Sequence, residues 1–236
     1  MSIPILNGMF GEPLPYQFYS DWIITSVLYL CILLSSFSFA KEKKYLLQQL
    51  KDFGSYKERG SLFDEVTTSD IRYLFLLRFQ TCLLLGLCFY FYYADSNPAI
   101  IEKISHGLLL TSFILSMIGF VFLKSIFYCF INWVFFQKVR NSIWITSFFN
   151  LIIWLGILLL PIVLVTVYFN IPTKIGLFLA FSVIIIAKIA LFWKCFYNFF
   201  EKIHGSFHLI LYFCALEILP ELLLWKGIEL LSNKLI

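Results

Sequence analysis

Six apolar segments recur along the chain, and each is long enough to cross a lipid bilayer. A membrane-spanning helix needs about 20 predominantly apolar residues. The composition agrees, because 61% of the residues are hydrophobic and 14% are charged, whereas soluble domains carry about 25% charged residues. We therefore predict an all-α membrane protein, a bundle of about six transmembrane helices. The predicted spans are residues 22–40, 71–94, 107–136, 144–169, 175–200 and 207–226.

Residues 41–70 form the one long hydrophilic segment between these spans. Leu46, Leu50 and Phe53 have the spacing of an apolar helical stripe, which predicts a short amphipathic cytoplasmic helix after the first span. Two settings fit it equally well, on the lipid surface or packed beneath the spans. Acidic residues are interleaved with the basic ones, so binding to nucleic acid is not predicted. The candidate contacts to anionic lipid are Lys41, Lys43 and Lys44.

Basic residues are distributed unevenly between the loops. Ten lysines and arginines lie in or beside the first, third and fifth loops, and four lie on the opposite side. Cytoplasmic loops carry an excess of Lys and Arg, so we predict a multi-pass protein of the bacterial inner (cytoplasmic) membrane with both termini outside the cytoplasm. Residues 1–20, where Pro and Gly prevent regular structure, would be an extracytoplasmic arm. Residues 21–236 would form a single transmembrane helical domain.

The last apolar segment, residues 207–226, contains two carboxylates, Glu217 and Glu221, and a proline at Pro220. An acidic residue near the centre of a span costs about 2.5–3.5 kcal/mol on insertion scales. Residues four apart share one helix face, so this face must point toward protein or water. The proline also frees a backbone carbonyl beside the first acid, and transporters build ion sites from such interrupted helices.

Four basic residues lie in the cytoplasmic halves of the predicted spans: Arg78, Lys124, Lys188 and Lys194. Long basic side chains near helix ends can extend to the membrane interface, and we assign Lys124 and Lys194 to that behaviour. Arg78 and Lys188 lie too deep in their spans to reach the interface easily. For these two residues we therefore prefer an ion pair with Glu217. A paired Glu217 would be a structural ion pair that fixes helix packing. An unpaired Glu217 would be a site for a proton or another ion, and the sequence leaves both hypotheses open.

Catalytic and metal-binding patterns are weak. His204 and His208 have a helical spacing that a metal pair could use, but Gly205 between them indicates a turn, and we rank metal binding low. The sequence contains no glycine-rich phosphate loop and no nucleophile elbow. We therefore predict a protein that is not an enzyme and that holds neither a metal nor a cofactor.

Several separated motifs resemble one family of membrane proteins. The chain resembles an uncharacterised family of polytopic inner-membrane proteins of the Bacteroidota, defined as a domain of unknown function. The resemblance implies an α-helical fold and a membrane location, and it implies no activity. The motifs are GEPLPY at 11–16 before Asp21, LKDF at 50–53, SLFDEVTTSDIR at 61–72, FQTCLLLG at 79–86, INWVFF at 131–136 and, above all, FHLILYFCALEILP at 207–220.

Two classes of function remain. The absence of a catalytic pattern, the short outer loops and the basic cytoplasmic segment favour a non-enzymatic interaction or assembly subunit of a cell-envelope complex, with other inner-membrane or envelope proteins as partners. The alternative is a small transporter or lipid-handling protein with a charged intramembrane site around Glu217. An enzyme acting on lipid is a distant third, because no nucleophile is evident.

Overall fold

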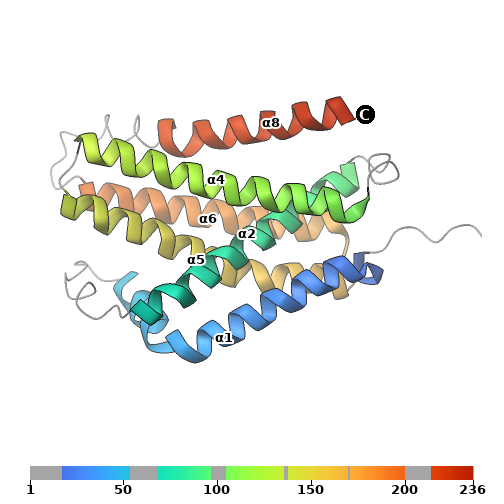
Figure 1. Cartoon of the computed structure of the whole chain (residues 1–236), viewed down its shortest axis with the longest axis horizontal. Helices are drawn as coiled ribbons and strands as arrows, with labels where there is room; N and C mark the ends of the chain where they lie inside the picture. Colours follow the sequence, from blue (N-terminus) through green and yellow to red (C-terminus); the bar gives the residue numbers. More distant parts are fainter. Residues whose placement is uncertain are drawn as a thin grey trace, which may run out of the picture.

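The computed structural model describes residues 18–53, 68–96, 105–135, 138–169, 171–199 and 214–235. Within these ranges the regular structure is helical, and the helices lie side by side as an all-α bundle (Figure 1). In chain order the elements are the 3₁₀ turn η1 (Phe18–Ser20), α1 (Trp22–Phe53), α2 (Thr68–Ser96), α4 (His106–Phe135), α5 (Lys138–Tyr168), α6 (Thr173–Phe199), the π-helical turn η4 (Cys214–Ile218) and α8 (Leu219–Leu235).

Five of the described helices are long and apolar enough to cross a membrane. These stretches are Trp22–Lys41, Arg72–Ser96, His106–Ile131, Ile145–Tyr168 and Thr173–Lys194, and they make the chain a multi-pass membrane protein. The segment predicted at 207–226 is described only from Cys214 onward. It is helical there and continues to Leu235, beyond the predicted end. Whether this sixth segment crosses the bilayer stays a prediction.

α2 lies at the centre of the bundle. In its apolar stretch 67% of the residues are buried, against 17–39% in the other four. The main hydrophobic core gathers Leu84, Leu87 and Phe91 of α2 with side chains from α1, α4, α5 and α6. Because α2 contacts α1, α4, α5 and α6, its apolar residues lie on several faces rather than along one stripe, as expected of a largely buried helix.

Small and hydroxyl-bearing residues bring α2 close to its neighbours. A Cβ at Gly86 would lie 2.7 Å from Cγ1 of Ile114 on α4, and one at Gly156 of α5 would collide with the side chain of Thr81. The Thr81 hydroxyl lies 3.0 Å from the carbonyl oxygen of Ile152 in α5. Small residues and interhelical hydrogen bonds of this kind hold helices together where lipid removes the hydrophobic driving force.

α1 combines the first predicted span and the predicted amphipathic helix in one continuous helix of 32 residues. Leu46 is buried and packs with Leu74 and Leu77 of α2 and Ile153 of α5. The structure therefore favours packing against the spans over a position on the lipid surface. The side chains of Leu50 and Phe53 lie outside the described ones.

The third and fourth predicted spans, residues 107–136 and 144–169, fall on the long helices α4 and α5. α4 is one long helix that continues past Lys124, as predicted. α5 contains Pro161 in its interior. The predicted arm at residues 1–20 is described only for its last three residues, which form η1. The beginning of α1 and the C-terminus lie at the same end of the bundle (Figure 1).

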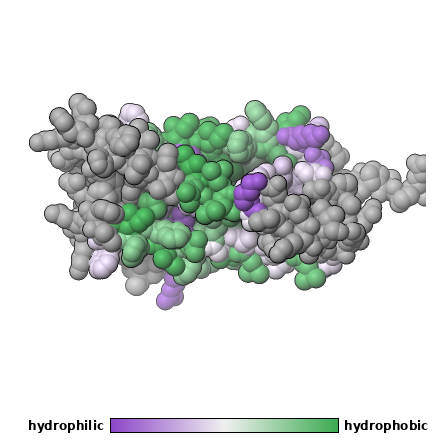
Figure 2. Space-filling view, turned by 90° about the horizontal axis from the view of Figure 1, so that it is seen from above, coloured by the Kyte–Doolittle hydropathy of each residue, from purple (hydrophilic) through white to green (hydrophobic). Residues whose placement is uncertain are grey.

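The outer surface of the bundle is apolar. Hydrophobic residues cover most of the described part of the face seen in Figure 2. Large apolar side chains such as Phe122, Phe178 and Leu223 are more than 60% exposed. A soluble protein rarely exposes so large an apolar surface, so this surface contacts the hydrocarbon of the bilayer.

Candidate functional site

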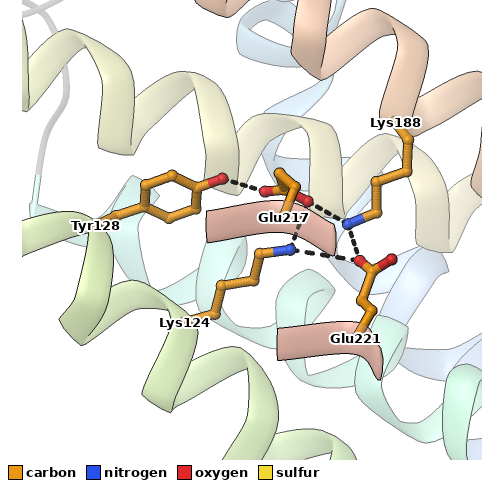
Figure 3. Close-up of polar contacts among 5 residues, drawn as sticks. All are labelled: Lys124, Tyr128, Lys188, Glu217 and Glu221. Atoms are coloured by element: carbon orange, nitrogen blue, oxygen red, sulfur yellow. Dashed lines mark hydrogen bonds and ion pairs between the residues drawn. The ribbon is translucent and has the colours of Figure 1, made fainter. Parts of the chain in front are cut away.

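Five polar side chains from three separate segments converge between α4, α6 and the last helical segment (Figure 3). We call this group the charge cluster. α4 contributes the first two, α6 the third, and η4 and α8 one carboxylate each. Its members are Lys124, Tyr128, Lys188, Glu217 and Glu221.

Glu217 lies at the centre of the charge cluster, and both of its carboxylate oxygens are engaged. The Lys124 ammonium lies 2.5 Å from Oε2, and the Lys188 ammonium pairs with the same oxygen. The Tyr128 hydroxyl donates a hydrogen bond to Oε1. One carboxylate thus ties α4 and α6 to the last helical segment, with three donors from two helices.

Glu221 forms the outer part of the charge cluster. Its Oε1 lies 3.4 Å from the Lys124 ammonium and also pairs with Lys188. The side chains of Glu217 and Lys124 are 1% and 4% exposed, whereas those of Lys188 and Glu221 are 30% and 43% exposed. The cluster therefore has a buried inner pair and a partly exposed outer pair, and its two lysines and two glutamates cancel in formal charge.

Apolar side chains surround the inner pair. Tyr128 packs in a second hydrophobic cluster with Phe148, Leu151, Leu191 and Leu216, and its ring centroid lies 5.0 Å from that of Phe148. Charges attract more strongly in such a low-dielectric setting than in water. Burying two charges costs several kcal/mol each, however, unless every polar atom is matched. The completeness of the contacts to Glu217 is what makes this arrangement tolerable.

The backbone around Glu217 departs from regular α-helix. Residues Cys214–Ile218 form a π-helical turn, and α8 begins at Leu219. Pro220 therefore falls in the first turn of α8 directly after the π-helical turn, and it has no backbone N–H to donate to that turn. Short π-helical turns occur frequently at functional sites. Here the turn buries Leu216 in the second hydrophobic cluster and Glu217 in the charge cluster.

Comparison with protein families finds one family model that matches most of the chain. The family model described as "Domain of unknown function (DUF4271)" matches residues 24–228. The chain belongs to this family. The match extends from α1 into α8 and includes every member of the charge cluster. No curated protein and no solved structure matches the chain.

Four residues that the sequence singled out come together in this DUF4271 chain: Lys124, Lys188, Glu217 and Glu221. The assignment of Lys124 to the membrane interface was wrong, because its ammonium is buried against Glu217. Lys124 lies in the middle of α4, and the next turn of that helix places Tyr128 on the same face. Tyr128 was not predicted as a site residue, and its i, i+4 spacing from Lys124 was the signal that could have found it.

Arg78 lies against an aromatic ring, whereas an ion pair with Glu217 was predicted for it. Its guanidinium lies over the ring of Phe149, 4.1 Å from the ring centroid, a favourable cation–π geometry. Within the described residues the ion pairs of Glu217 are with Lys124 and Lys188, so we assign Lys124 in place of Arg78. His204 and His208 lie outside the described residues. The described residues contain no group of three or more His, Cys, Asp and Glu side chains suited to a metal ion.

Proposed function

We propose that this DUF4271 chain is a non-enzymatic interaction or assembly subunit of a cell-envelope complex in the inner membrane of a bacterium of the Bacteroidota. The observation that supports it is the completeness of the charge cluster. Glu217 is matched by two ammonium groups and one hydroxyl and is 1% exposed. A carboxylate in this state fixes the position of helices and offers little to a cargo.

The outer pair supplies the second part of the argument. Lys188 and Glu221 remain partly exposed on a helix pair that also carries exposed apolar residues, among them Ile189 and Leu222. Ionisable groups near lipid are costly unless protein or water covers them. A partner helix that packs across α6 and α8 would remove that cost, which is why an assembly role fits this surface.

Affinity purification from native membranes after mild cross-linking tests the assembly role. The proposal expects a partner protein in a stoichiometric amount, and a Glu221→Gln variant should recover less of it. A matched variant, Phe122→Ala on the apolar surface of α4, should recover the partner in full, because Phe122 is exposed and residues two apart on a helix, such as Phe122 and Lys124, do not share a face. Recovery of the wild-type chain alone would contradict the proposal.

The orientation is part of the same proposal. Both termini lie outside the cytoplasm, and the basic last part of α1 faces the cytoplasm, where Lys41, Lys43 and Lys44 meet anionic lipid. In a variant without the native cysteines, an impermeant thiol reagent applied outside the cell should label Asn97→Cys and Asn233→Cys and leave Ser55→Cys unlabelled. Labelling at position 55 would reverse the orientation.

A transporter or lipid-handling protein is the second candidate. It is favoured by one observation, the π-helical turn and Pro220 directly beside a buried acid. Under this hypothesis Glu217→Gln folds normally and abolishes flux of protons or cations into liposomes that contain the purified chain. Under the assembly hypothesis the same variant is destabilised, and the wild-type liposomes show no flux above protein-free ones.

A further inference from the structure

A hollow of about 440 Å³ lies between the last part of α1 and the middle of α5. Its described lining is almost entirely apolar and includes one charged residue, Lys43. The lining residues are Phe39, Lys43, Leu46, Leu47 and Trp154. We call this hollow the α1–α5 groove. Its volume is in the range of sites that hold small ligands, about 300–1,000 Å³, and the charge cluster contributes nothing to it.

The position of the groove along the bundle narrows the class of ligand. The apolar stretch of α1 ends at Lys41, and Lys43 is two residues further, about 3 Å along a helix. Leu46 packs against Leu77 and Ile153, which lie inside the spans of α2 and α5. The groove therefore lies against membrane-embedded helices, with its cation just past the apolar part of α1.

The chemistry of the lining matches a lipid rather than a soluble metabolite. A water-soluble ligand would need several polar groups to orient it, and Lys43 is the one charged side chain among the described residues that line the groove. The side chain of Lys43 is exposed, and no acidic residue among the described ones forms an ion pair with it. Its methylene stem can lie along an apolar chain while the ammonium meets a phosphate.

We infer that the α1–α5 groove binds one phospholipid with an anionic headgroup. The acyl chain lies along Phe39, Leu47 and Trp154, and the headgroup phosphate pairs with the ammonium of Lys43. This site goes beyond a general attraction of the basic segment to anionic lipid, because it assigns the preference to one lysine. It depends on the membrane location of the chain and not on the proposed assembly role.

Retention of defined lipids by the purified full chain tests the site. The chain is exchanged into nanodiscs or detergent with phosphatidylglycerol or phosphatidylcholine, and bound lipid is counted by native mass spectrometry. The wild type should retain one phosphatidylglycerol in preference to phosphatidylcholine. Lys43→Gln should lower that preference about fivefold, the effect of one basic residue near an anionic surface, and Leu47→Trp, which fills the groove, should reduce retention of both lipids.

Lys41→Gln is the matched control, because Lys41 is an exposed lysine of the same helix and does not line the groove. It should retain phosphatidylglycerol as the wild type does. Equal losses in the Lys41 and Lys43 variants would replace the site with diffuse surface attraction. Equal retention of the two lipids by the wild type, or unchanged retention in Leu47→Trp, would also overturn the inference. Melting curves of the three variants confirm that each comparison is made on folded protein.

Discussion

α2 lies at the centre of the bundle and α8 at its edge, beside α4 (Figure 1), and the two helices contact their neighbours through different chemistry. α2 packs mainly through apolar side chains, and its hydrogen bonds to neighbouring helices include neutral ones, such as the 2.8 Å hydrogen bond from Ser35 of α1 to Gln80. The segment of η4 and α8 has a largely apolar exposed surface, and its strongest contacts to α4 and α6 are ion pairs.

The difference shows where a membrane protein needs charge. A helix with neighbours on every side gains packing along its whole length, and small residues such as Gly86 allow close contact. A helix at the edge has one packed side and cannot rely on packing alone. For η4 and α8 the other contacts include the ring pair of Tyr92 and Trp225, with centroids 5.3 Å apart, so the charge cluster should contribute most of what fixes its position.

Glu217→Gln should have the largest effect of the changes considered. It leaves Lys124 buried without its closest counter-charge, and breaking a buried pair from one side costs about 3–5 kcal/mol in soluble proteins. We expect a clearly lower melting temperature in detergent and poor accumulation in membranes. Unchanged thermal stability would contradict the structural pair and favour the transport hypothesis.

Tyr128→Phe removes the hydroxyl that donates to Oε1 of Glu217 and leaves the ring contact with Phe148 in place. Hydrogen bonds to charged groups contribute about 1.5–3 kcal/mol, so the loss in the free energy of unfolding should fall in that range. Thermal or denaturant unfolding in detergent measures it. A loss as large as that of Glu217→Gln would show that the tyrosine, and not the lysines, dominates the cluster.

Gly156→Ala tests the other side of the comparison, the packing around α2. The new Cβ would collide with the side chain of Thr81, and overpacking costs about 1–3 kcal/mol. Gly119→Ala on α4 is the matched control, because a Cβ there meets nothing within 4 Å. We expect Gly156→Ala to melt lower and Gly119→Ala to melt at or slightly above the wild-type temperature. Equal melting of the two variants would mean that the α2–α5 contact is looser than the structure shows.

Glu221→Gln should have the smallest effect on stability. Its side chain is 43% exposed and its ammonium partners are shared with Glu217, so the loss should stay below about 1 kcal/mol, as for exposed pairs. Parallel melting of the Glu217 and Glu221 variants compares the inner and outer acids directly. A loss equal to that of Glu217→Gln would erase the distinction between an inner and an outer pair.

Most of the fold could be predicted from sequence because membrane spans are encoded locally. The apolar length of each segment defined the helices, and the structure has five of them as membrane-crossing stretches. The apolar length of the segments did not predict that α1 continues without a break past Lys41. Its polar residues suggested a new element, whereas the burial of Leu46 against α2 and α5 is a tertiary contact that composition does not encode.

The charge cluster could be predicted only in part. Glu217 and Lys188 stood out because an ionisable residue inside a span demands a partner. The choice between Lys124 and Arg78 depended on how α4, α6 and the last segment meet, which no single segment specifies. Tyr128 gave no signal alone, because a tyrosine in an apolar helix is ordinary until an acid is placed opposite its hydroxyl.

A double-mutant cycle on Glu217 and Lys124 tests most directly whether charge holds the last helix in place. The unfolding free energies of Glu217→Gln, Lys124→Met and the double variant are compared with the wild type in one detergent. A second cycle on Glu217 and Arg78→Met is the comparison, because the guanidinium of Arg78 lies over the ring of Phe149. If the ion pair stabilises the fold, the double variant loses less unfolding free energy than the two single losses added together. The expected coupling energy is about 2 kcal/mol or more, in the upper part of the usual range of about 0.5–3 kcal/mol. Additive losses for Glu217 and Lys124, or equal coupling of Glu217 to Arg78, would contradict it.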